Sequence, residues 1–99
     1  ESTLNLLKRN GLTVNDIEAF EMNEAFAAQV IACNRELKVP MEKINLRGGA
    51  IALGHPIGAT GARILVTLSH VLKDKTGALG IATLCVSGGQ GVAVLVRVL

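Results

Sequence analysis

Residues 79–98 read LGIATLCVSGGQGVAVLVRV. Two runs of β-branched and aliphatic residues, 79–86 and 92–98, flank the glycine-rich segment 87–91. This arrangement predicts an antiparallel hairpin with a glycine-rich loop. Runs that are apolar at nearly every position are typical of strands covered by helices on both faces. The hairpin therefore predicts a central sheet that is covered by helices, as in an α/β fold.

Helices and strands alternate in the chain before this hairpin. A short helix up to Arg9 is closed by Asn10-Gly11, a strand covers residues 18–22, and residues 44–47 are a weaker strand candidate. This alternation predicts an α/β fold with a mixed, mostly parallel sheet. Such a sheet normally opens with a strand, whereas this chain opens with a helix. We therefore expect residues 1–99 to form one domain that lacks its first strand and is incomplete at its N-terminus.

Two longer helices are predicted from apolar residues at helical spacing. One has Asn23 as its N-cap, ends before Pro40, and carries the apolar stripe Phe26, Val30, Cys33 and Leu37. The other ends near Gly77 and has the apolar stripe Gly61, Ile64, Leu65, Leu68, Val71 and Leu72, opposite a polar face of Arg63, Thr67, His70 and Asp74. On this pattern Cys33 is a core residue, and His70 with Asp74 forms a solvated surface pair.

Composition excludes several classes of protein. The chain has 99 residues, of which 49% are hydrophobic and 18% charged, which suits one small folded domain and excludes intrinsic disorder. A net charge of +2, without a basic run and without Trp or Tyr, predicts neither a nucleic-acid partner nor an anionic membrane. No apolar stretch is long enough for a membrane span and residues 1–3 do not resemble a signal peptide, so a cytoplasmic protein is expected.

Three reactive side chains follow the predicted strands: Asn23, His55 and Cys85. Because ligands of open α/β sheets collect at the carboxyl ends of the strands, we expect these three on one rim. An amide, an imidazole and a thiol together can polarise a carbonyl and move protons, which suits acyl chemistry. The two cysteines have no CxxC spacing, so no metal site or disulfide framework is predicted.

Each of these residues also has a structural explanation. His55 lies in the stretch 48–63, GGAIALGHPIGATGAR, where it could serve only to hold the loop together by hydrogen bonds. Cys85 could be an ordinary buried thiol, and Asn23 an N-cap alone. Glu24 could complement the dipole of the following helix, or orient His55, and we favour the second role.

Three segments together resemble the C-terminal domain of the thiolases: Asn23-Glu24-Ala25-Phe26-Ala27, residues 48–63, and Cys85-Val86-Ser87-Gly88-Gly89-Gln90-Gly91. The resemblance covers essentially the whole chain. It implies the C-terminal half of a two-half thiolase fold. It also implies acyl transfer between CoA thioesters, by thiolytic cleavage of 3-ketoacyl-CoA or Claisen condensation of acetyl-CoA.

The resemblance assigns roles to individual residues. His55 is similar to the histidine that activates the nucleophilic cysteine and contributes to an oxyanion hole, and Asn23 to the asparagine that holds the water of that hole. Cys85 resembles the acid/base cysteine. Ser87 takes a position where the family often has glycine and uses the backbone N–H for the other oxyanion hole. Ala25 and Phe26 resemble residues of the acyl-binding region.

The family's nucleophilic cysteine and most of its CoA-binding surface belong to an N-terminal half that this sequence lacks. The chain alone is therefore expected to have no thiolase turnover, particularly since Cys33 is expected to face the core. By resemblance, acyl-CoA and CoA are substrates, no cofactor is needed, and the complete protein is a homo-oligomer. The alternatives are an inactive half-domain that acts only by association with other chains, and a relative of the ketoacyl synthases.

Overall fold

The computed structural model describes all of residues 1–99. Its α-helices are α1 (Ser2–Arg9), α2 (Ala27–Leu37), α3 (Ala50–Leu53) and α4 (Thr60–Leu72), and its strands are β1 (Ala19–Met22), β2 (Leu79–Val86) and β3 (Gln90–Arg97). Two single 3-10 turns, η1 (Val14–Asp16) and η2 (Met41–Lys43), lie in the connections. The α/β alternation and the C-terminal hairpin are confirmed.

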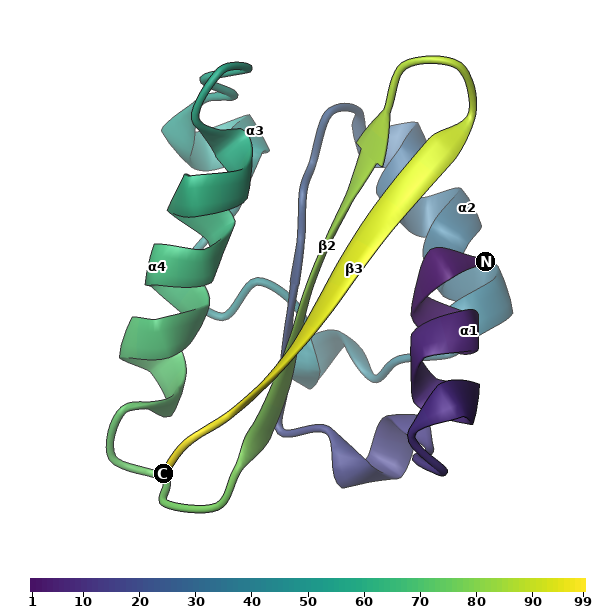
Figure 1. Ribbon diagram of the computed structural model, residues 1–99. Coiled ribbons are helices and arrows are strands. Elements are labelled where there is room, and N and C mark those ends of the chain that lie inside the picture. The colour runs from purple at the N-terminus through teal and green to yellow at the C-terminus, as the bar shows by residue number, and fades with distance from the viewer.

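The three strands form one mixed sheet in the order β1-β2-β3. β1 is parallel to β2, with Phe20 opposite Ile81, and β2 is antiparallel to β3, with Ile81 opposite Leu95. Helix α4 covers one face of this sheet, while α1 and α2 lie on the other (Figure 1). The β2–β3 turn and the connection from α3 to α4 lie at the same end of the sheet, which is also the carboxyl end of β2 (Figure 1).

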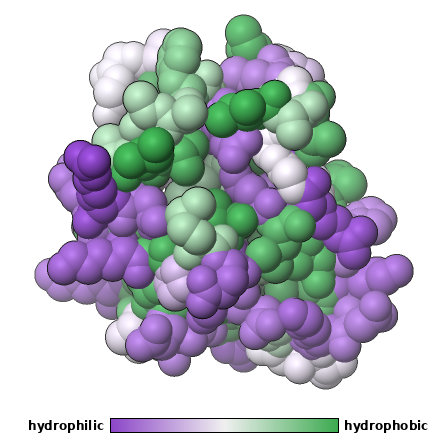
Figure 2. Space-filling view, turned by 180° about the vertical axis from the view of Figure 1, so that it is seen from behind, coloured by the Kyte–Doolittle hydropathy of each residue, from purple (hydrophilic) through white to green (hydrophobic).

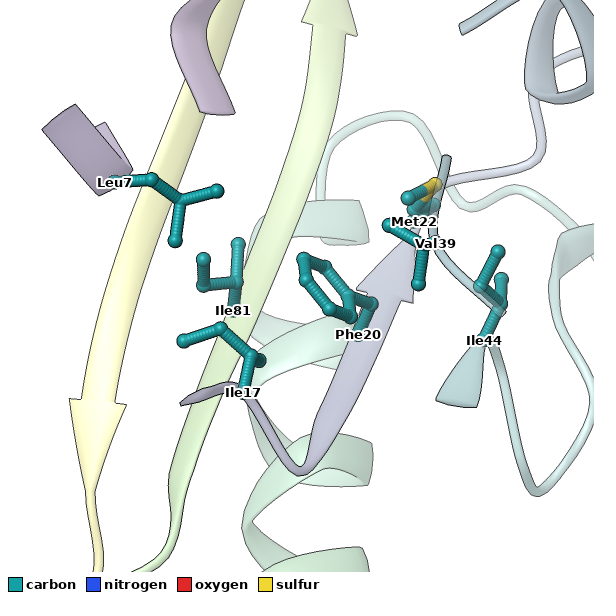
Figure 3. Close-up of a cluster of buried hydrophobic side chains, with 7 residues drawn as sticks. All are labelled: Leu7, Ile17, Phe20, Met22, Val39, Ile44 and Ile81. Carbon is teal, nitrogen blue, oxygen red and sulfur yellow. The ribbon is translucent and has the colours of Figure 1, made fainter. Parts of the chain in front are cut away.

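A cluster of seven buried apolar side chains fills the space beneath α1 (Figure 3): Leu7, Ile17, Phe20, Met22, Val39, Ile44 and Ile81. Phe20 and Ile81 are fully buried and come from paired strands. Burying such a side chain contributes roughly 1.5–3 kcal/mol relative to leaving it exposed. This cluster therefore fixes β1, the central strand β2 and the 39–44 segment as one unit.

A second cluster lies on the opposite face and comprises Ala19, Ile64, Leu68, Leu72 and Ala82. Three of these are the apolar stripe of α4, as the helical spacing predicted, although Leu65 of that stripe is 37% exposed. Gly80 permits the close approach of α4 to the sheet. A Cβ at this position would lie 2.5 Å from Leu72 Cδ1 and 3.0 Å from Leu68 Cδ1.

The prediction that Asn23 caps α2 is wrong. The helix begins four residues later, at Ala27, and Phe26 in an extended conformation (φ −145°, ψ 141°) precedes it. The backbone N–H of Asn23 instead donates to the carbonyl of Thr83 at 2.9 Å. Asn23 thus continues the hydrogen bonding of β1 with β2, and this pairing places it beyond reach of the helix N-terminus.

Only Leu37 of the predicted apolar stripe of α2 packs against the core, and it is partly buried. No residue of α2 is buried, Cys33 is exposed, and Phe26 is 75% exposed. The spacing correctly indicated an amphipathic helix, but within these 99 residues its apolar side has little to pack against. The core of the chain lies between the sheet and α1 on one face and between the sheet and α4 on the other.

Residues 44–47 form a single bridge rather than a strand. Ile44 bridges to Phe20 in parallel orientation, and the backbone N–H of Asn45 donates to the Phe20 carbonyl at 2.8 Å. Asn45 then turns the chain away from the sheet with a positive φ of 48°. Its side chain continues the pairing: Oδ1 accepts from the Met22 N–H at 2.8 Å, and Nδ2 donates to the Met22 carbonyl at 2.9 Å. One amide side chain thus replaces the next strand residue.

The surface carries exposed apolar side chains at the end where α3 and the β2–β3 turn lie, seen as green in the upper part of Figure 2. Ile57 is 84% exposed, Phe26 75%, Ile51 66% and Leu53 58%. Each belongs to α3 or to a segment that enters α2 or α4. None of the helices is long and apolar enough to cross a membrane.

Candidate active site

A pocket of about 360 Å³ lies between α1, α2, the carboxyl end of β2 and the beginning of β3. Among its lining residues are Asn23, Cys85, Cys33, Thr83 and Gln29. Two of the predicted site residues, Asn23 and Cys85, therefore share one pocket, as their positions after neighbouring parallel strands predicted. His55 is absent from this lining and lies in the α3–α4 connection.

Asn23 is the buried amide of the pocket. Only 3% of the residue is exposed, and its Oδ1 has no hydrogen-bond partner within the chain. A buried amide oxygen without a partner costs roughly 1–3 kcal/mol, so such atoms normally bind water or a ligand. Asn23 also lines the pocket, so its unpartnered amide oxygen lies at the wall of the space in which a ligand would bind.

Cys85 is close to the carboxyl end of β2, where it pairs with Gly91 of β3, and it is exposed. The buried part of β2 is confined to residues 80–82, so the idea of an ordinary buried thiol does not hold. Cys33 lies in the same pocket lining and is also exposed. The expectation that Cys33 is a core residue is therefore wrong: of the α2 stripe only Leu37 packs against the core, and Cys33 lies outside that contact.

The imidazole of His55 contacts the hydroxyl of Thr60, the first residue of α4. Its Nδ1 lies 2.7 Å from Thr60 Oγ1, and the same hydroxyl donates to the Pro56 carbonyl at 3.0 Å. Thr60 is only 4% exposed, whereas His55 is exposed. The ring is thus anchored through Nδ1, and Nε2 is the ring nitrogen available to another group.

Glu24 does not orient His55, contrary to our expectation. Its Oε2 accepts from Asn45 Nδ2 at 3.0 Å, and its Oε1 accepts from the backbone N–H of Ile51 at 3.1 Å. Gly49 passes directly beneath this carboxylate, where a Cβ would collide with it. Glu24 therefore secures the glycine-rich loop that leads into α3, and sequence reasoning missed its true partner, Asn45.

A buried ion pair lies on the opposite face of β1. Glu21 is 1% exposed and its Oε2 is 3.8 Å from Arg63 Nη1 of α4, so Arg63 does not belong to a solvated face. Burial raises the pKa of Glu21 to about 7, against the opposing attraction of the Arg63 guanidinium; the nearby Glu24 carboxylate adds to the rise. The alternation of side chains along β1 could have predicted that Glu21 lies on the face covered by α4. It could not have predicted that Glu21 lies beside Arg63.

The remaining predicted residues are dispersed. Ser87 is exposed in the β2–β3 turn, Ala25 is half-buried before α2, and neither lines the pocket. Phe26 is likewise outside the lining. His70 is exposed on α4 with Nδ1 2.9 Å from the Val66 carbonyl, so it faces its own helix rather than Asp74 or the pocket. No group of three or more His, Cys, Asp or Glu side chains could hold a metal ion.

Comparison with known proteins agrees with this arrangement of helices and sheet. Residues 1–98 match the family model described as "Thiolase, C-terminal domain". The chain belongs to this family. The resemblance found in the three sequence segments is thereby confirmed across the whole domain.

Two solved structures are similar to this thiolase C-terminal domain over nearly its full length. The Acat5 thiolase from Ascaris suum, crystallised in complex with coenzyme A, superposes with a TM-score of 0.93 and 45% identity, covering 98% of this chain and 25% of that one. The dimeric peroxisomal thiolase of Saccharomyces cerevisiae has a TM-score of 0.87 and 44% identity, covering 95% of this chain and 23% of that one.

Curated relatives are more similar in sequence. A probable acetyl-CoA acyltransferase of Staphylococcus epidermidis is 60% identical over 90 residues, and one of Staphylococcus aureus is 59% identical over the same length. These matches cover 91% of the chain but only 23% of each relative. The thiolase C-terminal domain described here thus spans about a quarter of the length of the relatives it matches.

Proposed function

We propose that this domain is the C-terminal catalytic portion of a thiolase that transfers acyl groups between CoA thioesters. The observation that carries the proposal is the meeting of a buried, unpartnered Asn23 with an exposed Cys85 in one pocket of a thiolase-family domain. Acyl-CoA and CoA are the proposed substrates. The relatives' name, acetyl-CoA acyltransferase, supports this substrate class.

In the proposed reaction, a cysteine from an N-terminal half attacks the keto carbon of a 3-ketoacyl-CoA while His55 Nε2 takes the thiol proton. The bond between the α and β carbons breaks, and its electron pair goes to the α carbon of the departing acetyl-CoA enolate. Cys85 gives that carbon a proton and becomes a thiolate. The Cys85 thiolate then takes the proton of CoA, whose sulfur attacks the acyl-cysteine and releases the shortened acyl-CoA. The nucleophilic cysteine leaves as a thiolate and recovers its proton from His55 Nε2.

Asn23 and Ser87 stabilise the negative oxygen that develops in these steps. The free Oδ1 of Asn23 accepts a hydrogen bond from a water, which in turn donates to the thioester oxygen, and the Ser87 backbone N–H serves the other oxyanion. Preorganised donors of this kind are worth roughly 3–4 kcal/mol each in a site that excludes water. Ala25 and Phe26 are proposed to contact the acyl group.

No turnover is expected from the 99-residue chain alone, because the nucleophilic cysteine belongs to the N-terminal half of the proposed enzyme. The sequence also predicts that Cys33 faces the core and so cannot replace that nucleophile. Because Cys33 is exposed, this second reason no longer applies. The complete protein is proposed to be a homo-oligomer, in keeping with the dimer described for the yeast enzyme.

The proposal is tested in a chimera in which residues 1–99 replace the matching segment of the S. epidermidis relative. Cleavage of acetoacetyl-CoA by CoA is followed by the loss of its absorbance. His55→Ala and Cys85→Ala are each expected to lower kcat by at least roughly 10²-fold, the usual contribution of general acid–base groups. The matched controls, His70→Gln and Cys33→Ala, are expected to stay within about twofold.

Equal losses in Cys33→Ala and Cys85→Ala would contradict the role of Cys85, since both thiols line the pocket. An active chimera in which Cys85→Ala has no effect would favour the alternative of a half-domain that acts only by association. The exposed apolar side chains near α3 favour association as an accompanying property.

A further inference from the structure

Thr60 makes two contacts through one hydroxyl group. Its Oγ1 is 2.7 Å from His55 Nδ1 and 3.0 Å from the carbonyl oxygen of Pro56. The residue is 4% exposed at the start of α4, so water has little access to this oxygen. The hydroxyl must therefore satisfy its neighbours with the single proton that it carries.

Counting protons fixes the direction of both hydrogen bonds. The Pro56 carbonyl is only an acceptor, so its contact with Oγ1 is a hydrogen bond only if Thr60 donates. The hydroxyl then has no second proton, and Nδ1 of His55 must donate to it. If Thr60 donated to His55 Nδ1 instead, the lone pairs of Thr60 Oγ1 and of the Pro56 carbonyl oxygen would face each other at 3.0 Å. In the neutral ring, Nδ1 therefore carries the proton and Nε2 carries the lone pair.

We propose that Thr60 is a positioning residue that holds His55 in the Nδ1–H tautomer, so that Nε2 can accept a proton. The role of this proton transfer rests on the proposed function, in which Nε2 takes a thiol proton. After the transfer, Nε2–H becomes a donor while Nδ1–H still bonds to Thr60. The ring thus keeps one orientation in both charge states, and neither step requires it to turn.

The Pro56 carbonyl helps to fix the direction of the Thr60 hydroxyl. It accepts from the backbone N–H of Ala59 at 2.7 Å as well as from Thr60, and a carbonyl oxygen has lone pairs for both. The turn 56–59 therefore holds the carbonyl in place, and the carbonyl holds the Thr60 proton away from His55. An exposed histidine without such a partner favours the Nε2–H tautomer in water, so the effect of Thr60 is measurable.

The test is ¹⁵N NMR of the imidazole nitrogens in the 99-residue chain, at a pH where both histidines are neutral. His55 is expected to show Nδ1 as the protonated nitrogen, and Thr60→Val to make Nε2–H the major form. Thr60→Ser keeps the hydroxyl and is expected to restore Nδ1–H. His70, whose Nδ1 faces the Val66 carbonyl at 2.9 Å, is an internal reference that should not change.

Two results would overturn the inference: an Nε2–H tautomer of His55 in the unaltered chain, or an Nδ1–H tautomer that persists in Thr60→Val. Circular dichroism of each variant confirms that the fold is retained. In the chimera, Thr60→Val is expected to lower kcat by roughly tenfold or more with KM within about twofold, and Thr60→Ser to recover it. A chimera that is inactive without any substitution would refute the proposed function and leave the tautomer result standing.

Discussion

Replacing Glu21 by Gln should change how stability depends on pH. The carboxyl group is 1% exposed, and burial raises its pKa from 4.5 to about 7. Below pH 4.5 the group is protonated in both the folded and unfolded chain and contributes nothing. Between pH 4.5 and 7 the unfolded chain releases this proton while the folded chain retains it, so stability falls as pH rises. Above pH 7 the loss is complete.

The size of this loss follows from the two pKa values. Each pH unit between them corresponds to about 1.36 kcal/mol, so the full loss is on the order of 3 kcal/mol. Glutamine has nearly the shape of the protonated carboxyl group and does not ionise. The variant is therefore expected to match the unaltered chain at pH 4 and to exceed its free energy of unfolding by about 2–3 kcal/mol at pH 8.

Urea unfolding followed by far-ultraviolet circular dichroism measures this difference, because the chain has no Trp or Tyr to report by fluorescence. The matched control is Glu18→Gln. Glu18 is about half exposed, and its hydrogen bond from Lys75 at 2.7 Å lowers its pKa, so the unaltered carboxylate adds a little stability above its ordinary pKa. The Glu18→Gln variant should therefore be slightly less stable than the unaltered chain at pH 8, the opposite sign to Glu21→Gln. A Glu21→Gln variant that is less stable than the unaltered chain at pH 8 would refute the reasoning, since the attraction of Arg63 would then outweigh burial.

Three further variants test the packing and hydrogen bonding of the fold, each by the free energy of unfolding in urea. Gly80→Ala should cost about 1–3 kcal/mol because its Cβ would press on Leu72, and pairing it with Leu72→Ala should recover part of that loss. Leu68→Ala empties a fully buried site and should cost about 2–5 kcal/mol; a smaller loss would show that α4 can settle onto the sheet. Asn45→Leu removes hydrogen bonds to Met22 and Glu24 and should cost roughly 2–3 kcal/mol; a neutral result would mean that the bridge at Ile44 suffices.

The sequence predicted those elements whose own residues supply their partners. The run 79–86 became β2 with the same bounds, and the stripe of Ile64, Leu68 and Leu72 packs on the sheet as expected. The sequence failed for α2, where the spacing indicated an apolar face but not what covers it. An amphipathic pattern records that a face can be buried, whereas burial depends on which other segments are present.

The candidate site divides in the same way. The residue types and their positions after strands predicted that Asn23 and Cys85 would meet at one rim, because parallel strands bring their carboxyl ends together. The partners of Glu24, Glu21 and His55 could not be predicted. Each depends on distances between segments far apart in the chain or on the course of a loop, and the sequence does not encode these in its local pattern.

Sequence alone determined the class of the fold, its hairpin and the family of the domain, because these depend on periodicity and on motifs within short segments. The tertiary structure decided that Asn45 completes the edge of β1, that Arg63 lies beside a buried Glu21, and that Thr60 directs the proton of His55. These contacts depend on sub-ångström differences in separation and on the number of protons available. Hydrogen bonding and burial are sensitive to such distances, whereas secondary structure tolerates much wider variation.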